Sequence, residues 1–320
     1  MKKETAMSGQ PLHVVVGAAG ATGRRVVAHL VAAGCEVRAL TRDGRSIGHP
    51  EAELGAADAT DPAALVAATV GASVIYHCAM PLIGRWRQDF PSLTDAVVSA
   101  AEEAAARVVF ADDTWMYGRV GGPMTPDLPY RPLSSLGVLR AWLAERLQHA
   151  AAAGRIRLSL VRAGELYGPG VRSMIAGNVF HAPGPGGRAF WFGSPDLPIT
   201  PTFIEDFART IATVGREDTS DCATWHVPHP EPTTGRALVA LAAREAGRRT
   251  AVTAVRSWRL RALGTVVPLA RTGVELLYQF EQPFVVDGTA TTKAFDLWPT
   301  PYVVGVRETH RGAGLQHSFS

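Results

Sequence analysis

Cysteine is scarce in this chain, which has three, Cys35, Cys78 and Cys222, far apart in the sequence. This number and spacing give neither a disulfide framework nor the paired Cys-x-x-Cys ligands of a metal site. His226 and His229 flank a proline, and no carboxylate or cysteine nearby completes a ligand set for zinc. The sequence therefore predicts no metal and a reduced, cytoplasmic setting.

Long apolar runs and a strong net charge are also missing. No apolar segment reaches the roughly 18 residues that a membrane span needs, and residues 1–10 are polar, without the apolar core of a secretion signal. The net charge is +3, and no run of lysine or arginine is interleaved with aromatic residues. We expect neither a membrane nor a nucleic acid as partner, and no feature of the sequence fixes an oligomeric state.

Short apolar segments alternate with segments of helical length. Val14-Val15-Val16 and Val108-Val109-Phe110 are apolar throughout, which is typical of strands buried on both faces of a parallel sheet. The alternation predicts an α/β fold, a Rossmann-like doubly wound parallel sheet with a smaller C-terminal substrate-binding lobe. The expected strands are residues 12–16, 36–40, 73–78, 107–111 and 157–161, and the expected helices are residues 21–33, 62–70, 93–106, 136–153, 205–214 and 233–246.

A glycine-rich segment, Gly17-Ala18-Ala19-Gly20-Ala21-Thr22-Gly23, follows the first expected strand and opens the first expected helix. Such spacing lets the backbone turn tightly, approach a pyrophosphate and direct the amides of the helix N-terminus towards it. The string also occurs in ordinary turns, but its position between strand and helix favours a dinucleotide site. The residues expected to bind the cofactor are Gly17, Ala19, Gly20, Ala21, Thr22 and Gly23.

The end of the second expected strand indicates which dinucleotide binds. An acidic residue there would bond the ribose 2′-hydroxyl of NAD, but this chain has Thr41 followed by Arg42. A guanidinium can hold a 2′-phosphate in a forked, charge-assisted contact, whereas a carboxylate would repel it. Arg42 can equally be a solvated charge, and the neighbouring Asp43 weakens the argument. The pattern favours NADP(H), with Thr41 and Arg42 as binding residues.

Asp58 follows the expected third strand, where its side chain can bond the adenine amino group. The alternative is a helix N-cap, although Asp61 before Pro62 fits that role better. Beyond Gly168, proline and glycine crowd residues 181–187, which is typical of a loop or lid. We therefore predict that residues 1–168 are mainly the NADP-binding domain and that 169–320 are mainly the substrate lobe, with segments returning to the first domain.

Together these motifs resemble the extended short-chain dehydrogenase/reductase family, which includes nucleotide-sugar epimerases and dehydratases. Further segments match its pattern in the right order. Residues 74–79 are similar to its fourth strand and the turn beside the nicotinamide ribose, and residues 110–118 to its Ser-Ser-x-x-Val-Tyr-Gly strand. Residues 162–170 are similar to Arg-Pro-x-x-x-Tyr-Gly-Pro-Gly, residues 203–206 to Val-x-Asp, and residues 293–299 to the terminal Lys-Ala-x-x-Leu-Gly-Trp-x-Pro.

The departures from this family fall on its chemistry. Its Tyr-x-x-x-Lys pair corresponds here to Leu136 and Arg140, and Leu136 can neither give nor take a proton. Arg140 keeps a positive charge that can hold the hydroxyls of the nicotinamide ribose, but arginine does not shuttle protons. The resemblance thus implies cofactor contacts for Arg140, Ala79 and Ala163.

Three side chains are candidate catalytic donors in place of the tyrosine. The family's Ser or Thr, four residues before the Tyr of its Tyr-Gly pair, corresponds to Asp113, and Thr114 is next to it. Thr114 can donate a hydrogen bond to a carbonyl, and Asp113 can do so if burial keeps it protonated. Both can equally belong to a hydrogen-bond network at the strand end. His181 is the third candidate, because its ordinary pKa is near neutrality.

The missing tyrosine changes which reactions are expected. Hydride addition to a ketone builds alkoxide charge, and losing one general acid costs about 10²–10⁴-fold in rate. A polycyclic phenol with its hydroxyl beside the ketone can stabilise that charge itself. Sugar epimerisation or dehydration is less favoured, because the family's mechanism starts with proton abstraction by tyrosinate. Departures of this kind resemble the atypical ketoreductases of aromatic-polyketide antibiotic pathways.

The sequence therefore predicts an oxidoreductase that reduces a hydrophobic, aromatic polycyclic ketone with NADPH. An aromatic slot at the carboxyl ends of the strands is expected to bind the substrate, although core packing explains any single aromatic residue. The residues proposed for this slot are Trp86, Trp115, Tyr117 and Phe192. Two alternatives stay open: a non-catalytic NADP-binding sensor or regulatory protein, and a cofactor-retaining nucleotide-sugar epimerase or dehydratase.

Overall fold

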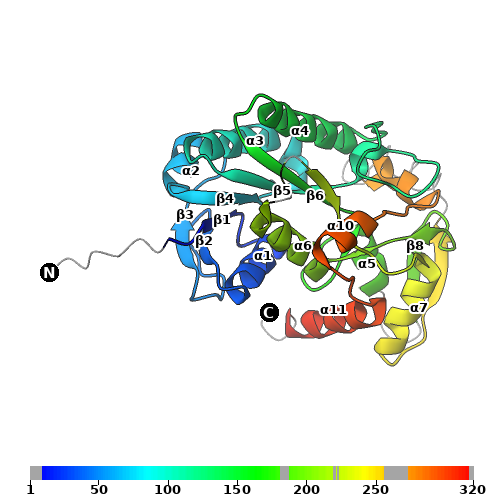
Figure 1. Cartoon of the computed structure of the whole chain (residues 1–320). Helices are drawn as coiled ribbons and strands as arrows, with labels where there is room; N and C mark the ends of the chain where they lie inside the picture. Colours follow the sequence, from blue (N-terminus) through cyan, green and yellow to red (C-terminus); the bar gives the residue numbers. More distant parts are fainter. Residues whose placement is uncertain (1–8, 181–186, 219–220, 222, 256–272, 317–320) are drawn as a thin grey trace. The chain divides into compact units, whose positions relative to one another are not determined.

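The computed structural model describes residues 9–180, 187–218, 221, 223–255 and 273–316 (Figure 1). Its elements, in chain order, are β1 (Leu12–Val16), α1 (Ala21–Ala32), β2 (Glu36–Thr41), β3 (Glu53–Ala56), α2 (Pro62–Ala68), β4 (Ala72–His77), η1 (Ile83–Arg85), α3 (Trp86–Glu103), β5 (Arg107–Asp113), η2 (Trp115–Tyr117), α4 (Ser135–Ala152), β6 (Arg157–Ala163), β7 (Leu166–Tyr167), α5 (Met174–Phe180), β8 (Arg188–Phe192), β9 (Pro198–Ile199), β10 (Thr202–Phe203), α6 (Ile204–Arg216), β11 (Ala223–His226), β12 (Thr233–Thr234), α7 (Gly235–Glu245), β13 (Ala251–Val255), η4 (Leu277–Phe280), α10 (Thr289–Phe295) and α11 (Tyr302–Gln316).

Seven strands form one sheet in the order β11-β6-β5-β4-β1-β2-β3. The pairs β1/β2, β2/β3, β1/β4 and β4/β5 are all parallel. The strand order reverses between β1 and β4, and in doubly wound sheets a ligand binds outside the carboxyl ends of the strands at such a point. The predicted doubly wound α/β fold is thus confirmed, and the turns after β1 and β4 are the expected place for a ligand.

The described residues form two compact units that are interleaved along the chain. The first unit takes its described residues from 1–110, 147–159 and 214–222, and the second from 111–146, 160–213 and 223–320. Because the units alternate in this way, no single position in the sequence separates them. The predicted division near residue 168 concerns cofactor-binding and substrate-binding parts, and it stays a prediction.

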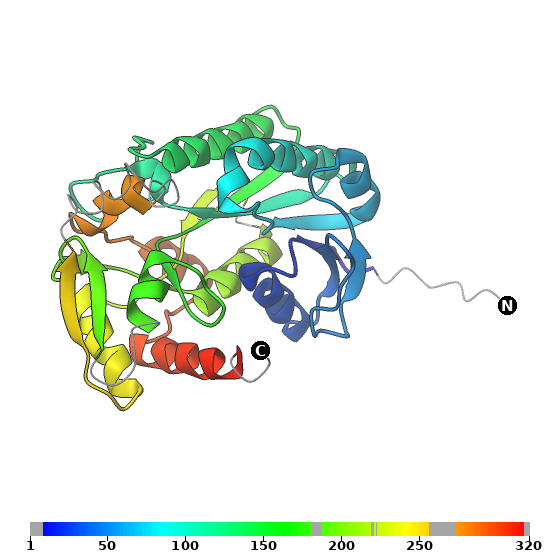
Figure 2. The same cartoon turned by 180° about the vertical axis from the view of Figure 1, so that it is seen from behind.

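In the first unit, helices cover both faces of strands β1 to β4. All five residues of β1 are buried, as expected for a strand inside a parallel sheet. Figure 1 shows α1 on one face and α2 with α3 on the other, and Figure 2 shows the same from behind. The buried side of α1 consists of Gly23, Val26, Val27 and Leu30, which repeat at helical spacing.

Helix α3 begins earlier than the sequence predicts. The predicted helix starts at residue 93, two residues after Pro91, and proline lacks a backbone N–H and usually breaks a helix. In the structure α3 begins at Trp86 and contains Pro91. Phe90 and Leu93 on either side of Pro91 are buried, so packing of this segment offsets the hydrogen bond that proline cannot make.

In the second unit, three small two-stranded sheets carry the remaining strands: β7 with β10, β9 with β12, and β8 with β13. The β8/β13 pair is parallel, and α7 lies beside α11 (Figures 1 and 2). Trp191 of β8 is fully buried, and its ring fills the space where Gly235 lacks a side chain. This packing ties β8 to the start of α7.

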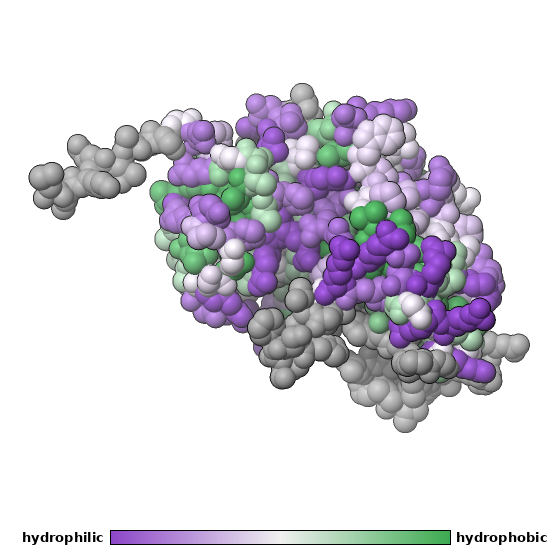
Figure 3. Space-filling model, turned by 90° about the horizontal axis from the view of Figure 1, so that it is seen from below, coloured by the Kyte–Doolittle hydropathy of each residue, from purple (hydrophilic) through white to green (hydrophobic). Residues whose placement is uncertain are grey.

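No helix in the described part of the chain is long and apolar enough to cross a membrane. On the face seen in Figure 3, hydrophobic residues lie in separate groups between hydrophilic ones.

Candidate functional site

The turn between β1 and α1 depends on glycine for a steric reason. Gly17 has φ of +85°, and a Cβ on it would lie 2.5 Å from Cα of Ala79, in the turn after β4. A Cβ on Gly23 would lie 2.3 Å from the carbonyl oxygen of Gly17. The amides of Gly17 and Ala18 both donate to the carbonyl of Leu40 in β2. The loop predicted to bind a dinucleotide is therefore held close to the ends of β2 and β4.

The N-terminus of α1 is suited to an anion. Its N-cap is Gly20, no side chain caps the first amides, and the first turn contains no acidic residue. Amides at a helix start carry partial positive charge and favour a negatively charged group. Because the glycines keep side chains out of the turn, these residues fit the pyrophosphate of a dinucleotide. Ala19, Ala21 and Thr22 are partly exposed in this turn.

Two arginines and one carboxylate follow β2. Asp43 accepts hydrogen bonds from Nε of Arg45 at 3.0 Å and from the hydroxyl of Thr41 at 3.5 Å. Arg42 is exposed and makes no ion pair within the part of the chain that the structure describes. Arg45 pairs with Asp43, so the carboxylate next to Arg42 has a partner of its own. The charge of Arg42 acts at longer range on Asp58 and Asp89 and helps to lower their pKa values.

Asp58 and Asp61 have different roles. Asp58 accepts hydrogen bonds from the backbone amide and the hydroxyl of Thr60 at 3.0 and 2.8 Å, and these bonds lower the pKa of Asp58. Asp61 accepts from the amides of Ala63 and Ala64 and is the N-cap of α2. The N-cap role preferred for Asp61 from the sequence is confirmed. The adenine contact of Asp58 stays a prediction.

In the second unit, Arg140 is paired with two carboxylates at the end of β5. Its Nε lies 3.2 Å from Oδ1 of Asp112 and 2.7 Å from Oδ2 of Asp113. The side chain of Arg140 is only 5% exposed, and that of Asp112 is fully buried. Leu136, one helical turn earlier on α4, is buried as well. The residues at the family's Tyr and Lys positions thus form apolar packing and a buried ion pair. The cofactor contact of Arg140 stays a prediction.

Arg162, on β6, binds the same aspartate from the other side. Its Nε lies 3.0 Å from Oδ2 of Asp112, and both side chains have no exposed surface. Its remaining nitrogens donate to the hydroxyls of Tyr117, at 2.6 Å, and Tyr130. The guanidinium lies 5.1 and 4.9 Å from the centres of these two rings, where cation–π attraction adds to the charge pair. Asp112 therefore joins β5, β6 and α4 through two arginines.

A chain of hydrogen bonds continues from Arg162 through Tyr117 to His226. The Tyr117 hydroxyl lies 2.8 Å from Nε2 of His226, and Nδ1 of His226 lies 3.1 Å from the carbonyl oxygen of Met124. A carbonyl can only accept, so Nδ1 carries the proton and Nε2 accepts from the tyrosine. Burial, together with the charge of Arg162, lowers the pKa of His226 to about 4. This histidine is a neutral structural residue.

Beside this network lie Thr114, Glu165 and Gln279. Thr114 is 1% exposed, and its hydroxyl has no hydrogen-bond partner among the described residues. Glu165 lies two residues after β6, and its Oε1 is 3.4 Å from Nε2 of Gln279. Burial raises the pKa of Glu165 to about 7. Burial also raises the pKa of Asp113 to about 6, although the charge of Arg140 acts in the opposite direction.

Glu165 was missed by the sequence reasoning as a functional residue. The available signal was its place as the only acidic residue of segment 162–170, which resembles a family motif. Among the residues that were predicted, Asp113 and Thr114 do lie together at the end of β5. Ala163 is buried at the end of β6. His181 lies outside the described residues.

The aromatic residues predicted to bind substrate have contacts of their own. Trp86 is 5% exposed, and its indole N–H donates to the carbonyl of Pro81. Tyr117 is 1% exposed and engaged by Arg162 and His226. Trp115 and Phe192 are partly exposed. These contacts give Trp86 and Tyr117 structural roles, and a substrate contact for any of the four stays a prediction.

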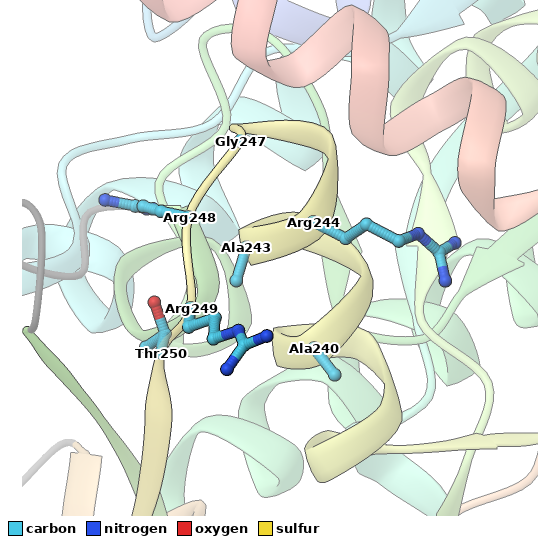
Figure 4. A pocket seen from close by; sticks show the side chains of 7 residues that line it. All are labelled: Ala240, Ala243, Arg244, Gly247, Arg248, Arg249 and Thr250. Carbon is cyan, nitrogen blue, oxygen red and sulfur yellow. The ribbon is translucent and has the colours of Figure 1, made fainter.

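A hollow of about 490 Å³ lies at the C-terminal end of α7. Its lining includes Arg244, Arg248 and Arg249, and Figure 4 shows that these side chains point in different directions. Since they do not converge on one point, they do not form a clamp for a single anion. The hollow contains none of the groups described above.

Comparison with family models matches residues 13–182, more than half of the chain, to "NAD dependent epimerase/dehydratase family". The chain belongs to this family. The matched segment runs from β1 past the end of α5 and contains the glycine turn, Arg140, Arg162 and Glu165. Membership implies a nicotinamide dinucleotide and an enzyme of oxidoreductase or epimerase type, as the resemblance to extended short-chain dehydrogenase/reductases predicts. Comparison with curated proteins gave no match.

Solved structures show the same fold over nearly the whole length of this family member. A dTDP-glucose 4,6-dehydratase from Streptomyces venezuelae with NAD and TYD bound is 18% identical, with a TM-score of 0.75 and coverage of 96% of this chain and 98% of the other. The UDP-glucose 4-epimerase of Thermus thermophilus in complex with NAD is 18% identical, with a TM-score of 0.74 and coverage of 94% and 98%. UDP-glucuronic acid 4-epimerase from Bacillus cereus, in complex with UDP-glucuronic acid and NAD, is 16% identical, with a TM-score of 0.74 and coverage of 95% and 99%.

Proposed function

We propose that this chain is an NADPH-dependent reductase of a ketone on a hydrophobic, aromatic polycyclic substrate, working without a tyrosine general acid. The observation that carries the proposal is that the chain keeps the family's dinucleotide-binding turn but lacks the family's catalytic tyrosine and lysine. The glycine turn and the α1 N-terminus fit a dinucleotide, whereas the Tyr and Lys positions hold buried Leu136 and ion-paired Arg140. In these departures the chain resembles the angucyclinone ketoreductase of simocyclinone biosynthesis.

Arg42 supports NADPH rather than NADH. A 2′-phosphate adds negative charge beside the adenosine ribose, and a guanidinium at the end of the second strand is the usual partner for it. Arg45 occupies Asp43 at 3.0 Å, so Arg42 has no carboxylate to neutralise it within 4 Å among the described residues. Thr41 is buried beside it, at the strand position where a carboxylate would select NAD.

The residues of the second unit support reduction because they contain hydrogen-bond donors without the tyrosine. The cofactor supplies a hydride when it is bound. The Thr114 hydroxyl is free to donate to the oxygen that becomes negative as the carbonyl is reduced. Arg140, held by Asp112 and Asp113, keeps positive charge at the end of β5. A phenolic hydroxyl on the substrate supplies further stabilisation through its own hydrogen bond to the ketone.

A second candidate function is a cofactor-retaining nucleotide-sugar epimerase or dehydratase. It is favoured by the likeness in fold to the dehydratase and the epimerases described above. Against it, the first proton abstraction expected of this family needs a base where this chain has Leu136. The third possibility, an NADP-binding sensor without turnover, shares the missing tyrosine and differs in having no reaction at all.

The deciding experiment mixes the purified chain with NADPH and a panel of polycyclic ketones that carry a hydroxyl beside the carbonyl. We expect NADPH absorbance to fall only when ketone is added, with formation of the alcohol. Matched ketones whose hydroxyl is methylated should react more slowly. Conversion of UDP-glucose or dTDP-glucose without net loss of NADPH would favour the second candidate instead. Tight NADPH binding without turnover of any of these compounds would favour the sensor.

Arg42→Met tests the choice of cofactor separately. The loss of one charge-assisted contact, about 1.5–3 kcal/mol, should weaken NADPH binding at least about tenfold. Binding of NADH should change little. The control is Arg87→Met, which removes another exposed arginine of the same unit. Isothermal titration calorimetry measures all four pairs, and equal weakening of NADPH and NADH in Arg42→Met would contradict an NADP preference.

A further inference from the structure

Glu165 and Asp113 follow neighbouring strands at one edge of the sheet. Asp113 is the last residue of β5, and Glu165 comes two residues after the end of β6. β5 and β6 are adjacent in the sheet, so both carboxyl groups lie at the carboxyl ends of the strands, where doubly wound folds bind their ligands. Asp113 is already engaged by Arg140 at 2.7 Å and by the amide of Trp115. Glu165 has no arginine or lysine partner among the described residues.

Two buried polar atoms beside these carboxyl groups lack partners. Gln279 is 1% exposed, and its Nε2 donates to Glu165 and to the carbonyl of Leu276. Its amide oxygen has no hydrogen-bond partner among the described residues, and neither has the hydroxyl of Thr114. Leaving a buried polar atom unpaired is unfavourable. Gln279 lies beside Glu165, and Thr114 adjoins Asp113, so an unpaired acceptor and an unpaired donor accompany these two carboxyl groups. Such atoms are typical of a place that receives a polar ligand.

The surroundings favour the uncharged form of Glu165. Burial raises its pKa to about 7, and the nearby charge of Asp113 acts in the same direction, while the Gln279 amide and the backbone amide of Met174 at the start of α5 act against it. Burial raises the pKa of Tyr278 further above its ordinary value of 10, and the charges of Asp113 and Glu165 act in the same direction, so this phenol stays protonated near neutrality. Asp113, whose pKa is about 6, also exchanges a proton in this range, but it is paired with Arg140. Glu165 is therefore the carboxyl group of this cluster that exchanges a proton near neutrality without an arginine partner among the described residues.

We propose that the carboxyl group of Glu165 is the proton donor to the ketone oxygen, in place of the missing tyrosine. This inference rests on the proposed reduction. Thr114 then donates a hydrogen bond to the same oxygen, and the free amide oxygen of Gln279 accepts one from a hydroxyl of the substrate. Glu165 thus supplies acid catalysis from the segment after β6, whereas the family pattern supplies it from the position of Leu136 on α4.

The proton and electron balance of this step is complete. The carbonyl carbon gains a hydrogen with its electron pair from NADPH, and the C=O π electrons move to oxygen. That oxygen takes the proton of Glu165, which leaves an alcohol, NADP⁺ and the Glu165 carboxylate. Water then returns one proton to the carboxylate. The sum is ketone, NADPH and one proton giving alcohol and NADP⁺.

A structural role for Glu165 is the competing explanation, because its carboxyl group also accepts from the Met174 amide at the start of α5. Glu165→Gln separates the two roles, since glutamine keeps the size and an accepting oxygen but cannot lose a proton near neutrality. We expect kcat of ketone reduction to fall about 10²–10⁴-fold, with KM nearly unchanged. In the natural protein kcat should fall as pH rises through about 7, and this limb should vanish in Glu165→Gln.

Two further variants complete the kinetic test. Glu165→Asp should recover part of the rate and restore a pH limb. Glu145→Gln, at an exposed position on α4, should leave both kcat and the pH profile unchanged. Thermal unfolding checks that each variant is folded. A folded Glu165→Gln protein with kcat within twofold of the natural protein and the same pH limb would overturn the proposal.

A second readout does not depend on turnover. Infrared difference spectra of the chain between pH 5 and pH 9 should show a protonated carboxyl band that titrates near pH 7 and is absent from Glu165→Gln. If no ketone is reduced, the proposed function fails on its own, and this spectrum then decides the state of Glu165. A Glu165 carboxyl already ionised at pH 5 would overturn its role as a neutral acid. A band titrating near pH 7 would support it.

Discussion

The glycine turn of the first unit is formed by backbone atoms, whereas the ionic network of the second unit is formed by charged side chains. The turn is made of backbone: Gly17 and Gly23 leave no space for a Cβ, and Gly20 begins α1 without a capping side chain. The network is made of long charged side chains, with Asp112 held between Arg140 and Arg162. A backbone site tolerates few changes of residue, whereas a side-chain site can exchange its members.

This contrast explains why one site keeps the family pattern while the other departs from it. The turn needs residues without Cβ atoms at set positions, so the motif stays readable in the sequence. In the network, burying any charge requires an opposite charge beside it. Arg140 pairs with Asp112 and Asp113. Because each charge depends on the others, we expect these residues to be replaced together rather than one at a time.

The largest expected effect comes from breaking the network at its centre. Arg162→Met leaves Asp112 with one arginine and removes a donor from Tyr117. Removing one partner of a buried ion pair costs about 3–5 kcal/mol of the free energy of unfolding, measured by urea denaturation. The matched control is Arg236→Met, whose pair with Asp196 is about half exposed and should matter little. Equal losses in the two variants would show that burial does not decide the strength of these pairs.

Gly17→Ala tests the turn in the same way. Alanine at φ of +85° with its Cβ 2.5 Å from Ala79 is strained by up to about 3 kcal/mol. If the turn moves to relieve this strain, dinucleotide affinity should fall about 100-fold, as measured by calorimetry. Gly84→Ala adds a methyl group with nothing within 4 Å and should bind normally. Unchanged affinity in Gly17→Ala would mean that the close approach to Ala79 is not needed for binding.

Acid should weaken the network through His226. The pKa of this histidine is lowered in the fold to about 4, from the ordinary value of 6.5, so the folded state holds it neutral. Its contribution is complete above pH 6.5 and is lost as pH falls towards 4. Between pH 7.5 and 5.5 this linkage costs about 1 kcal/mol. Urea midpoints of the natural chain and His226→Asn should converge on acidification, and parallel curves would contradict this role.

The smallest expected effect concerns the N-cap of α2. Asp61→Ala removes the acceptor for the amides of Ala63 and Ala64 and should cost about 1 kcal/mol of stability. Dinucleotide affinity should be unchanged once the variant is folded. Asp58→Ala should do the reverse if Asp58 contacts adenine, lowering affinity with little change in the urea midpoint. The pair of variants therefore separates a structural from a binding aspartate within one segment.

Local features of the sequence were enough to predict much of the fold. Strand β1 was predicted at its observed bounds, Leu12–Val16, because a run of buried β-branched residues identifies a central strand. The cap at Asp61 was predictable because an acidic residue before Pro62 is a helix-start signal. The predicted start of α3, residue 93, was wrong. Tertiary packing on either side of Pro91 outweighs the tendency of proline to break a helix.

The sequence does not predict all the residues of the network in the second unit, or of the Glu165 cluster beside it. The Tyr117–His226 hydrogen bond joins residues that are 109 positions apart, and the Glu165–Gln279 bond spans 114. No spacing rule links such residues before the chain is folded. Asp113 and Thr114 were found because they adjoin a strand with a familiar pattern. Glu165 differs because its chemistry arises from burial, which the sequence around it does not reveal.

The interleaving of the two units means that a protein shortened to its first 168 residues lacks part of the first unit. Arg107, which is 2% exposed in β5, is held by Asp218 and Asp221 at 2.9 and 2.6 Å. Both acids come from the late segment that rejoins the first unit. A chain stopped at residue 168 lacks both acids and the carbonyls of residues 214, 215 and 217 that accept hydrogen bonds from Arg107, so we expect its first unit to be less stable. During synthesis, the first unit is complete only after residues 214–222 have been added, when more than two thirds of the chain has been made.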